Sequence, residues 1–552
     1  MSSESTPLLA DQREAQYSGN HESPSSASRV EFMPPMRILA PIVISLWVPV
    51  FIASLDSTIV ATLVGSISSS FKASEQASWV GSSYLLSLCC FNPLLGRMSD
   101  VFGRRGTMLT SLVLFTIGTL GCGTAQDLKS FLAARVIAGA GGGGLTTTSN
   151  IIMTDLIPLR NRGLVQGCTN IIFGLGSGLG GPVGGFLNDI FDWRKAFLVQ
   201  VPFLALAFTL ALVFVKDSRD SNHSNLALPF KTKLRRIDFL GSFSLVSAVA
   251  CILVPLSLLS GADASPSDPQ VWGIFLTGAF SLAAFLYVET SLAAQPILPM
   301  KLLADRTGAG VSLSNFGLSV TSFATLYTYP LYFQAVRLES AREAGIHIIP
   351  YSVALSTSSV AAGAYMRATG RFKKYTVLMS LFQLFGSLLL FAMNSETPEW
   401  LSYFAVVPMG VGGAGVLTTT LIAVINIVPR SEIAVSTAIT YLFRTSGQIL
   451  GVGLSGAVLQ FSLRNELRKR IPCNEDLVTR IRHSSQLIAH LPVDLQRKAG
   501  EAYYVSFQKV WVFLSIVSVA TVLGCVAIED RELPKFKHSD GKDADEECQR
   551  AR

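Results

Sequence analysis

The chain has 552 residues, of which 49% are hydrophobic and only 15% are charged, and its net charge is +7. Soluble domains contain about 25% charged residues. Here the charges gather in short clusters and in the two tails, between apolar runs of about 20 residues, the length that crosses a bilayer. The pattern predicts an all-α polytopic membrane protein and excludes most soluble enzymes.

The charged residues and the cysteines also bear on partners and cofactors. Basic residues lie beside the apolar runs rather than in one stripe, which argues against nucleic acid as a partner. The eight cysteines form no CxxC pair or regular spacing, and the sequence contains no GxxxxGK[ST] run. We therefore expect no cofactor, no metal site and no ATP-driven step.

Residues 1–36 form a Ser-rich tail with too little apolar content to fold. Within it, Glu4, Leu8 and Leu9 make an acidic dileucine pattern, typical of cytosolic sorting signals that adaptor proteins read. The tail has no cleavable signal peptide, so the first apolar span is expected to act as its own insertion signal.

Fourteen apolar spans follow, and each is expected to be a helix because a lipid-exposed backbone must satisfy its own hydrogen bonds. We divide them as six, two and six: a bundle at 37–215, a cytosolic loop with an inserted helix pair at 216–306, and a bundle at 307–528 that includes a lumenal loop at 461–509, before a tail at 529–552. The spans are 38–64, 78–95, 107–125, 131–155, 164–187, 196–215, 238–260, 271–291, 308–335, 344–365, 375–393, 401–427, 434–460 and 510–528.

Orientation follows from Lys and Arg in the loops, which are in excess on the cytosolic side. One alternating set of loops contains eighteen of these residues and the other contains six, when the long loop 461–509 is left out. Both termini are therefore predicted to be cytosolic.

Asp56 lies in the first span, toward its lumenal half. An ionised carboxylate is costly inside a membrane, so we expect this side chain to face a wet cavity or to be protonated. One carboxylate that holds either a proton or a cationic substrate would provide the physical basis of antiport. The alternative is that Asp56 caps a helix end near the interface.

The loop between spans two and three reads Gly96-Arg97-Met98-Ser99-Asp100-Val101-Phe102-Gly103-Arg104-Arg105. Its glycines permit a tight turn. Asp100 can cap the third helix and pair with Arg104 or with a neighbouring helix end. Such a cluster can lock one face of a carrier by charge pairing, or it can be a positive-inside anchor without a gating role.

The fourth and fifth spans carry further candidates. Arg135 begins span four, where it either snorkels to the headgroups or faces a cavity. Asp155 ends that span beside Arg160 and Arg162, where an interface salt bridge is expected. Span five is rich in small residues that let a partner helix pack closely, and Pro182 permits a bend. Its packing set is Gly174, Gly178, Gly180, Gly181, Pro182, Gly184 and Gly185.

The second half of the chain repeats motifs of the first. Gly96–Arg104 is similar to Gly363–Arg371, and Gly141–Thr148 is similar to Gly412–Thr420. Matching halves predict two bundles that rock about a central cavity, although Gly and Thr also recur in any packed membrane helix. Arg444, in span thirteen, is another intramembrane cation that needs a cavity or a helix-end partner.

These motifs resemble the major facilitator superfamily, and more narrowly its fourteen-span drug:proton antiporter branch. The resemblance rests on the loop at 96–105, on Leu55–Val60 in span one, on Arg135–Gly142, on Asp155–Gly163 and on Gly174–Gly185. It implies that Arg135 faces the cavity and influences proton release. Ala61, Gly65 and Ala138 depart from the branch pattern.

Within that branch, Ser78–Leu86 running into Pro93–Gly96 is most similar to fungal vacuolar basic amino acid transporters. The resemblance implies proton antiport of lysine, arginine or histidine from the cytosol into the vacuole, with the bilayer, protons and a small cationic substrate as partners. A plasma-membrane exporter of drugs and a transport-dead nutrient sensor are the alternatives. The sensor is disfavoured by short tails.

Overall fold

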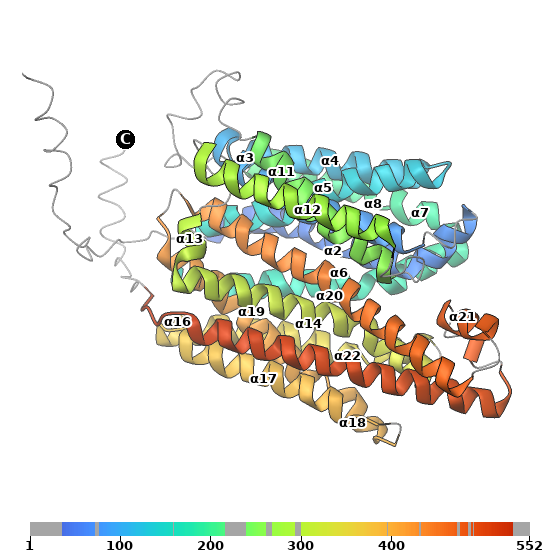
Figure 1. Cartoon of the computed structure of the whole chain (residues 1–552). Helices are drawn as coiled ribbons and strands as arrows, with labels where there is room; N and C mark the ends of the chain where they lie inside the picture. The colour runs from blue at the N-terminus through green and yellow to red at the C-terminus, as the bar shows by residue number, and fades with distance from the viewer. Residues whose placement is uncertain are drawn as a thin grey trace, which may run out of the picture. The chain divides into compact units, whose positions relative to one another are not determined.

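The computed structural model describes residues 36–71, 77–157, 159–215, 239–260, 268–292, 300–339, 341–394, 396–429, 432–471, 475–483, 487–488 and 491–533. These residues are almost entirely helical (Figure 1). The first half contains α2 (Met36–Ser70), α3 (Ala77–Phe102), α4 (Arg104–Thr124), α5 (Leu128–Leu156), α6 (Leu159–Ile190), α7 (Trp193–Leu198) and α8 (Gln200–Phe214).

A helix pair and a second set of long helices follow. The pair is α11 (Phe239–Ser260) and α12 (Pro269–Tyr287), the latter ending in a π-helical turn (Val288–Leu292). The second half contains α13 (Met300–Ala304), α14 (Arg306–Val336), α15 (Ala341–Ile346), α16 (Ile349–Thr369), α17 (Lys373–Ala392), α18 (Glu399–Phe404), α19 (Val407–Ile427), α20 (Ile433–Arg470), α21 (Glu475–His483) and α22 (Val493–Ala527).

Every predicted span coincides with one of these helices over most of its length. By length and apolar composition alone, seven helical segments in the described part of the chain could cross a membrane: 39–60, 104–124, 193–214, 373–392, 399–427, 435–470 and 493–527. Several others, such as α5 and α6, are rich in Gly, Ser and Thr, which lowers hydropathy while permitting close packing. The number of crossings, fourteen, stays a prediction.

The two halves pack by the same device. In the first half α4 packs on α5, and a Cβ on Gly141 would lie 2.4 Å from the backbone nitrogen of Phe115. In the second half α17 packs on α19, and a Cβ on Gly412 would lie 2.4 Å from the backbone nitrogen of Gln383. The repeated glycine runs therefore place corresponding helix pairs in backbone contact.

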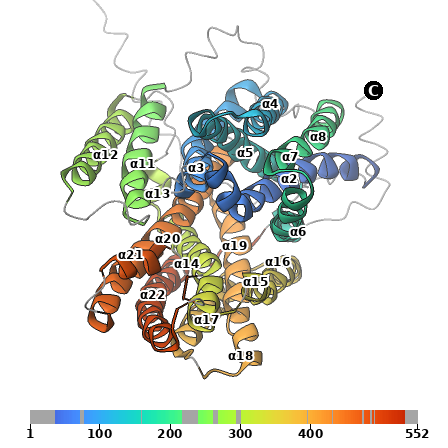
Figure 2. The same ribbon diagram turned by 90° about the vertical axis from the view of Figure 1, so that its right-hand side faces the viewer.

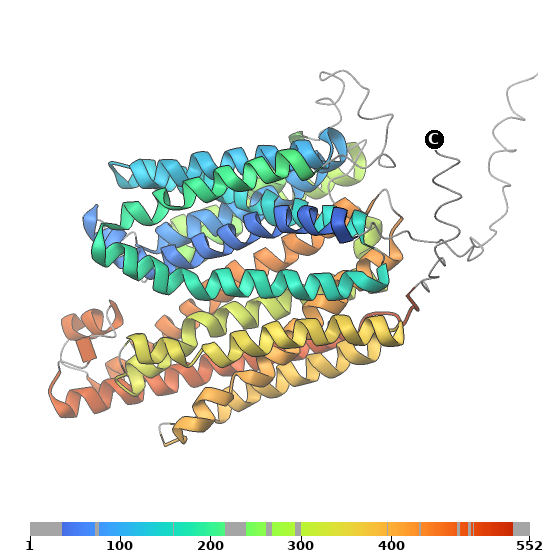
Figure 3. The same cartoon turned by 180° about the vertical axis from the view of Figure 1, so that it is seen from behind.

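Figure 2 shows α11 and α12 side by side at the edge of the molecule, next to α3 and α20. α11 packs on α12, α3 and α20. The two bundles contact each other directly along α6 and α16. Figure 3 shows the same bundles from behind, with α6 between α2 and the second half. An inserted pair at this place does not interrupt the interface between the halves.

The segment 461–509, expected to be a loop, is largely helical among its described residues. α20 continues to Arg470, α21 packs on it through Val478 and Ile481, and α22 begins at Val493. Buried Leu463 and Leu467 supply the other side of this contact. Apolar residues at helical spacing within a polar segment explain why it folds onto the bundle rather than remaining a loop.

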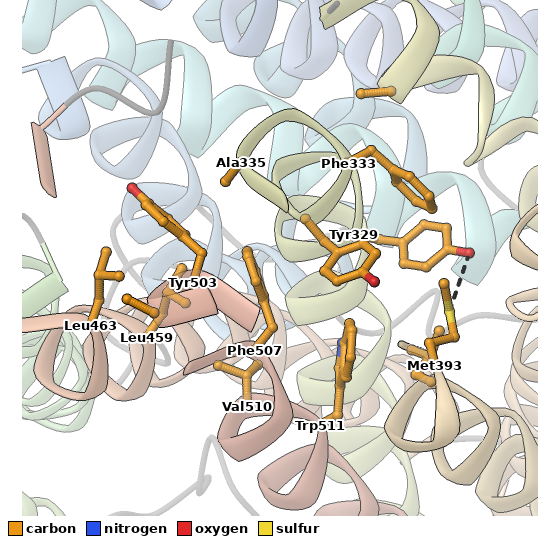
Figure 4. Packing of buried hydrophobic residues seen from close by; sticks show 14 of the residues in the cluster. Tyr329, Phe333, Ala335, Met393, Leu459, Leu463, Tyr503, Phe507, Val510 and Trp511 are labelled. Carbon is orange, nitrogen blue, oxygen red and sulfur yellow. Dashed lines mark hydrogen bonds between the residues drawn. The ribbon is translucent and has the colours of Figure 1, made fainter. Parts of the chain in front are cut away.

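An aromatic cluster joins this end of α14 to α22 (Figure 4). The ring centroid of Tyr332 lies 5.1 Å from that of Trp511 and 5.7 Å from that of Phe507. The hydroxyl of Tyr329 donates to the carbonyl of Ser402 and also faces the sulfur of Met393. The cluster fixes α14, α18 and α22 relative to one another.

Candidate functional site

Asp56 and Arg135 form an ion pair in the interior of the first bundle. Nη1 of Arg135 lies 2.7 Å from Oδ2 of Asp56, and both side chains are 1% exposed. Asp56 belongs to the middle of α2 and Arg135 to α5. The sequence marks each residue as a candidate but does not show that they pair.

Aromatic and sulfur groups surround the pair. The guanidinium carbon of Arg135 lies 4.4 Å from the ring centroid of Tyr84 on α3, and Cys122 of α4 is also a neighbour. Oδ1 of Asp56 and Nε of Arg135 are buried and have no hydrogen-bond partner within the described ranges. One carboxylate oxygen thus keeps its lone pairs for a further ligand or a proton.

This geometry corrects three expectations. Asp56 neither faces an open cavity nor caps a helix end, because it lies within α2 and is enclosed by its partner. Arg135 does not snorkel, since its side chain is buried. The expectation that Asp56 faces a wet cavity was therefore wrong for this conformation.

A second charge cluster lies at the predicted cytosolic end of the same bundle. Arg104, at the start of α4, donates from Nη1 to Oδ1 of Asp100 at 2.8 Å and from Nε to Oδ2 of Asp155 at 2.9 Å. It also donates to the Ser99 carbonyl at 2.9 Å. Arg105 donates to the carbonyl of Leu212 on α8 at 2.7 Å. One arginine therefore ties together the ends of α3, α4 and α5.

Two details of this cluster differ from expectation. Asp155 pairs with Arg104, a partner that the sequence reasoning did not consider, whereas Arg162 donates from Nε to the Ile157 carbonyl. Asp100 does not cap α4, whose N-cap is Gly103. The cause is the tight turn at Gly103, which places Arg104 between the two carboxylates.

The turn itself is repeated in the second half. Gly103 has φ 89° and the corresponding Gly370 has φ 67°, conformations that favour glycine. The arginine after each glycine then forms an ion pair: Arg104 with Asp100 and Asp155, and Arg371 with Glu532. The repeat therefore preserves the backbone turn but not the acidic partners. Gly96, one residue of the same motif, is buried within α3.

The glycines of α6 fall into two groups. Gly176, Gly180 and Gly184 face α2, and a Cβ on Gly180 would collide with Thr58. Gly178 and Gly185, which were also expected to serve close packing, have nothing within 4 Å of a Cβ, so that expectation was wrong for them. Gly174 and Gly181 have single neighbours at 3.2 and 3.4 Å. α6 runs without a break through the exposed Pro182.

The two bundles touch along α6 and α16 near the predicted cytosolic ends of these helices. A Cβ on Gly363 would lie 2.4 Å from the carbonyl carbon of Gly163. Farther along, Nδ2 of Asn170 donates to Oγ of Ser359 at 2.7 Å. α3 and α20 also meet, with Sγ of Cys89 3.1 Å from Oγ of Ser446.

The same faces separate toward the other end of the helices. On α16, Val353 and Ile349 continue the face of Ser356 and Gly363 at helical spacing and are 57% and 53% exposed. On α6, Gly178 and Gly185 continue the face of Gly167 and Gly174 and have open space beside them. The α6 and α16 faces are therefore in contact toward the predicted cytosolic side and uncovered at these positions toward the predicted lumenal side.

Arg444 lies on α20 and is half-buried. Its guanidinium carbon lies 5.3 Å from the ring centroid of Tyr441. Pro158 and the sorting residues Glu4, Leu8 and Leu9 lie outside the described residues. Within the described ranges, no group of three or more His, Cys, Asp or Glu side chains could hold a metal ion.

Comparison with known proteins decides the family. The profile of the Major Facilitator Superfamily matches residues 46–452. The chain belongs to the major facilitator superfamily. As a member, it is a multi-pass membrane transporter rather than an enzyme.

Curated superfamily relatives carry two kinds of name. The chain is 37% identical to multidrug resistance protein fnx1 of Schizosaccharomyces pombe, over 86% of this chain and 90% of that protein. It is 35% identical to the vacuolar membrane amino acid uptake transporter fnx2 of the same organism, over 88% and 83%. Vacuolar basic amino acid transporter 2 of Saccharomyces cerevisiae is 28% identical, over 84% and 99%.

Solved structures of superfamily transporters share the fold. The proton:xylose symporter XylE aligns with a TM-score of 0.57 at 17% identity, covering 90% of this chain and 98% of that one. At this identity the likeness supports the all-α major facilitator fold and does not bear on the substrate.

Proposed function

We propose that this transporter moves basic amino acids, namely lysine, arginine and histidine, from the cytosol into the vacuole in exchange for protons. The observation that carries the proposal is the buried ion pair of Asp56 and Arg135. The names of relatives support the substrate class and the vacuolar membrane, since they include a vacuolar amino acid uptake transporter and a vacuolar basic amino acid transporter.

The pair supplies the chemistry that exchange needs. When Asp56 takes up a proton from the lumen it loses its charge, and its attraction to Arg135 falls. When it is ionised, its second oxygen, without a partner among the described side chains, can accept hydrogen bonds from an ammonium group. Because one carboxylate cannot hold a proton and fully attract a cation at once, occupancy by one disfavours the other.

The enclosure of Asp56 limits how a proton and a substrate can reach its carboxylate. Its side chain is 1% exposed while α6 and α16 are in contact toward the predicted cytosolic side. Because Arg135 of the same bundle encloses it, proton and substrate are proposed to reach Asp56 only when these two side chains separate. Each pH unit across the membrane is worth about 1.4 kcal/mol, or a tenfold substrate gradient for one-to-one exchange.

The charge cluster of Arg104, Asp100 and Asp155 is proposed to hold the first bundle rigid at its cytosolic end during this movement. It links three helices through one partly buried guanidinium. The acidic dileucine signal at Glu4, Leu8 and Leu9 is proposed to address the protein to the vacuole, read by a sorting adaptor.

Uptake into purified vacuolar vesicles tests the function. Vesicles with a proton gradient should accumulate labelled lysine or arginine, and accumulation should stop when the gradient is collapsed. Asp56→Asn should abolish it when uptake is compared at equal protein level, whereas Asp127→Asn, which neutralises an exposed acid at the start of α5, should not. Equal uptake by vesicles that lack the protein would refute the assignment.

Proton-coupled export of drugs is the second candidate, favoured by the name of the relative fnx1. It predicts plasma-membrane localisation that does not depend on Leu8 and Leu9. The variant with Leu8 and Leu9 both replaced by alanine distinguishes the two candidates. Its location should change if the protein is directed to the vacuole by this signal, and should stay at the plasma membrane if it is a drug exporter.

A further inference from the structure

Arg444 is a membrane cation that lacks an acidic partner. Unlike Arg135, it forms no ion pair with any carboxylate in the described part of the chain. The acid that lies deep within a described membrane helix is Asp56, which Arg135 already neutralises. An uncompensated guanidinium in a membrane protein is costly. This cost would be offset by an anion that binds Arg444 during part of the transport cycle.

The surroundings of Arg444 are polar, aromatic and contributed by both bundles. The ring of Tyr441 lies beneath its guanidinium, and the Tyr441 phenol lies close to Gln166 of α6 and Asn150 of α5. Tyr351 of α16 is also near Arg444. Oδ1 of Asn150 is buried without a hydrogen-bond partner within the described ranges.

These groups lie where the halves of the transporter meet. Asn150 and Gln166 belong to the first bundle, whereas Tyr351, Tyr441 and Arg444 belong to the second. A ligand held by all of them bridges the two bundles. The planar guanidinium donates two parallel hydrogen bonds, and a carboxylate accepts two in the same geometry.

We propose that Arg444 binds the α-carboxylate of an amino acid substrate, with the Tyr441 hydroxyl as a neighbouring donor and Oδ1 of Asn150 as an acceptor for the α-ammonium group. The inference rests on the proposed function and narrows it. The carboxylate of an amino acid complements the charge of Arg444, whereas a simple organic cation has no group that does so.

Decarboxylated analogues provide the probe. Cadaverine is lysine without its carboxylate and keeps both amino groups. For the native protein, cadaverine should inhibit labelled lysine uptake at least tenfold less effectively than unlabelled lysine. In Arg444→Gln the KM for lysine should rise at least tenfold while inhibition by cadaverine stays within twofold, and Arg444→Lys should recover part of the loss. Arg531→Gln, which removes an exposed arginine paired with Glu529, is the matched control.

A binding measurement separates this inference from the antiport proposal. Lysine should raise the melting temperature of the purified native protein, cadaverine should raise it less, and Arg444→Gln should lose the rise caused by lysine. If that pattern holds while vesicles show no proton-driven uptake, the carboxylate site stands and antiport falls. No rise with lysine, equal rises with lysine and cadaverine, or an undiminished lysine effect in Arg444→Gln would overturn the site.

Discussion

Nη1 of Arg135 and Oδ2 of Asp56 approach to 2.7 Å inside the first bundle, and neither side chain is more than 1% exposed. The pair joins α2 to α5, two helices that also meet through other contacts. Removing one partner leaves the other charge buried, which costs about 3–5 kcal/mol. A loss of transport on mutation therefore has to be separated from a loss of folding.

The double variant Asp56→Asn with Arg135→Gln makes that separation. It should fold better than either single variant, because no uncompensated charge remains, and should still be unable to couple uptake to protons. Melting temperature and vesicle uptake of the three variants are the measurements. Proton-driven uptake by the double variant would rule out Asp56 as the coupling group.

Gly363→Leu should prevent closure of the bundles on the predicted cytosolic side. The new Cβ would overlap the backbone of Gly163, so α6 and α16 must part. In a chain that keeps Cys89 as its one cysteine, this buried thiol should react with a maleimide about tenfold faster than in the parent. Gly273→Leu, where nothing lies within 4 Å of a Cβ, should leave the rate unchanged.

Gly180→Val and Gly178→Val should differ sharply, although the two residues share a helix. At Gly180 the valine collides with Thr58 of α2, whereas at Gly178 it enters open space. Overpacking costs about 1–3 kcal/mol, so the melting temperature should fall only for Gly180→Val. Equal melting temperatures would show that α2 and α6 are not packed as described.

The N-cap of α5, on the predicted lumenal side, should withstand an acidic lumen. Asp127 accepts hydrogen bonds from the side chain and backbone of Ser130, which lower its pKa. Its contribution to stability is therefore present above the ordinary aspartate pKa of about 3.9 and lost as the pH falls through the lower pKa of the folded state.

The test compares melting temperatures of the native protein and Asp127→Ala. The difference should be the same at pH 7 and pH 5 and should shrink only below about pH 4. Loss of the difference already at pH 5 would contradict the lowered pKa.

The helices and the repeat could be predicted from the sequence because both depend on local composition. Hydropathy locates each span, and the recurring glycines mark helix pairs that pack in the same way. Asp56, Arg135 and Arg444 were also found, since an ionisable residue in an apolar run stands out whatever surrounds it.

The pairing of Asp100 with Arg104, four residues apart, was predicted and is confirmed, but hydrogen-bond and ion-pair partners on distant helices could not be predicted. Asp56 and Arg135 are 79 positions apart, and their meeting depends on how α2 and α5 are rotated, which no short motif records. The same holds for Arg104 with Asp155 and for Asn170 with Ser359. The helix at 475–483 did leave a signal: two acids precede Leu477, Val478 and Ile481 at helical spacing.

α20 and α22 contain 38 and 35 residues, so they extend about 57 and 52 Å at 1.5 Å per residue, against a hydrocarbon core of about 30 Å. If the second bundle tilts during transport, their far ends and the α21 between them would move like the end of a lever. A tilt of about 10° would swing the tip by about 9 Å at this length, enough for a fluorophore on α21 to follow each transport cycle.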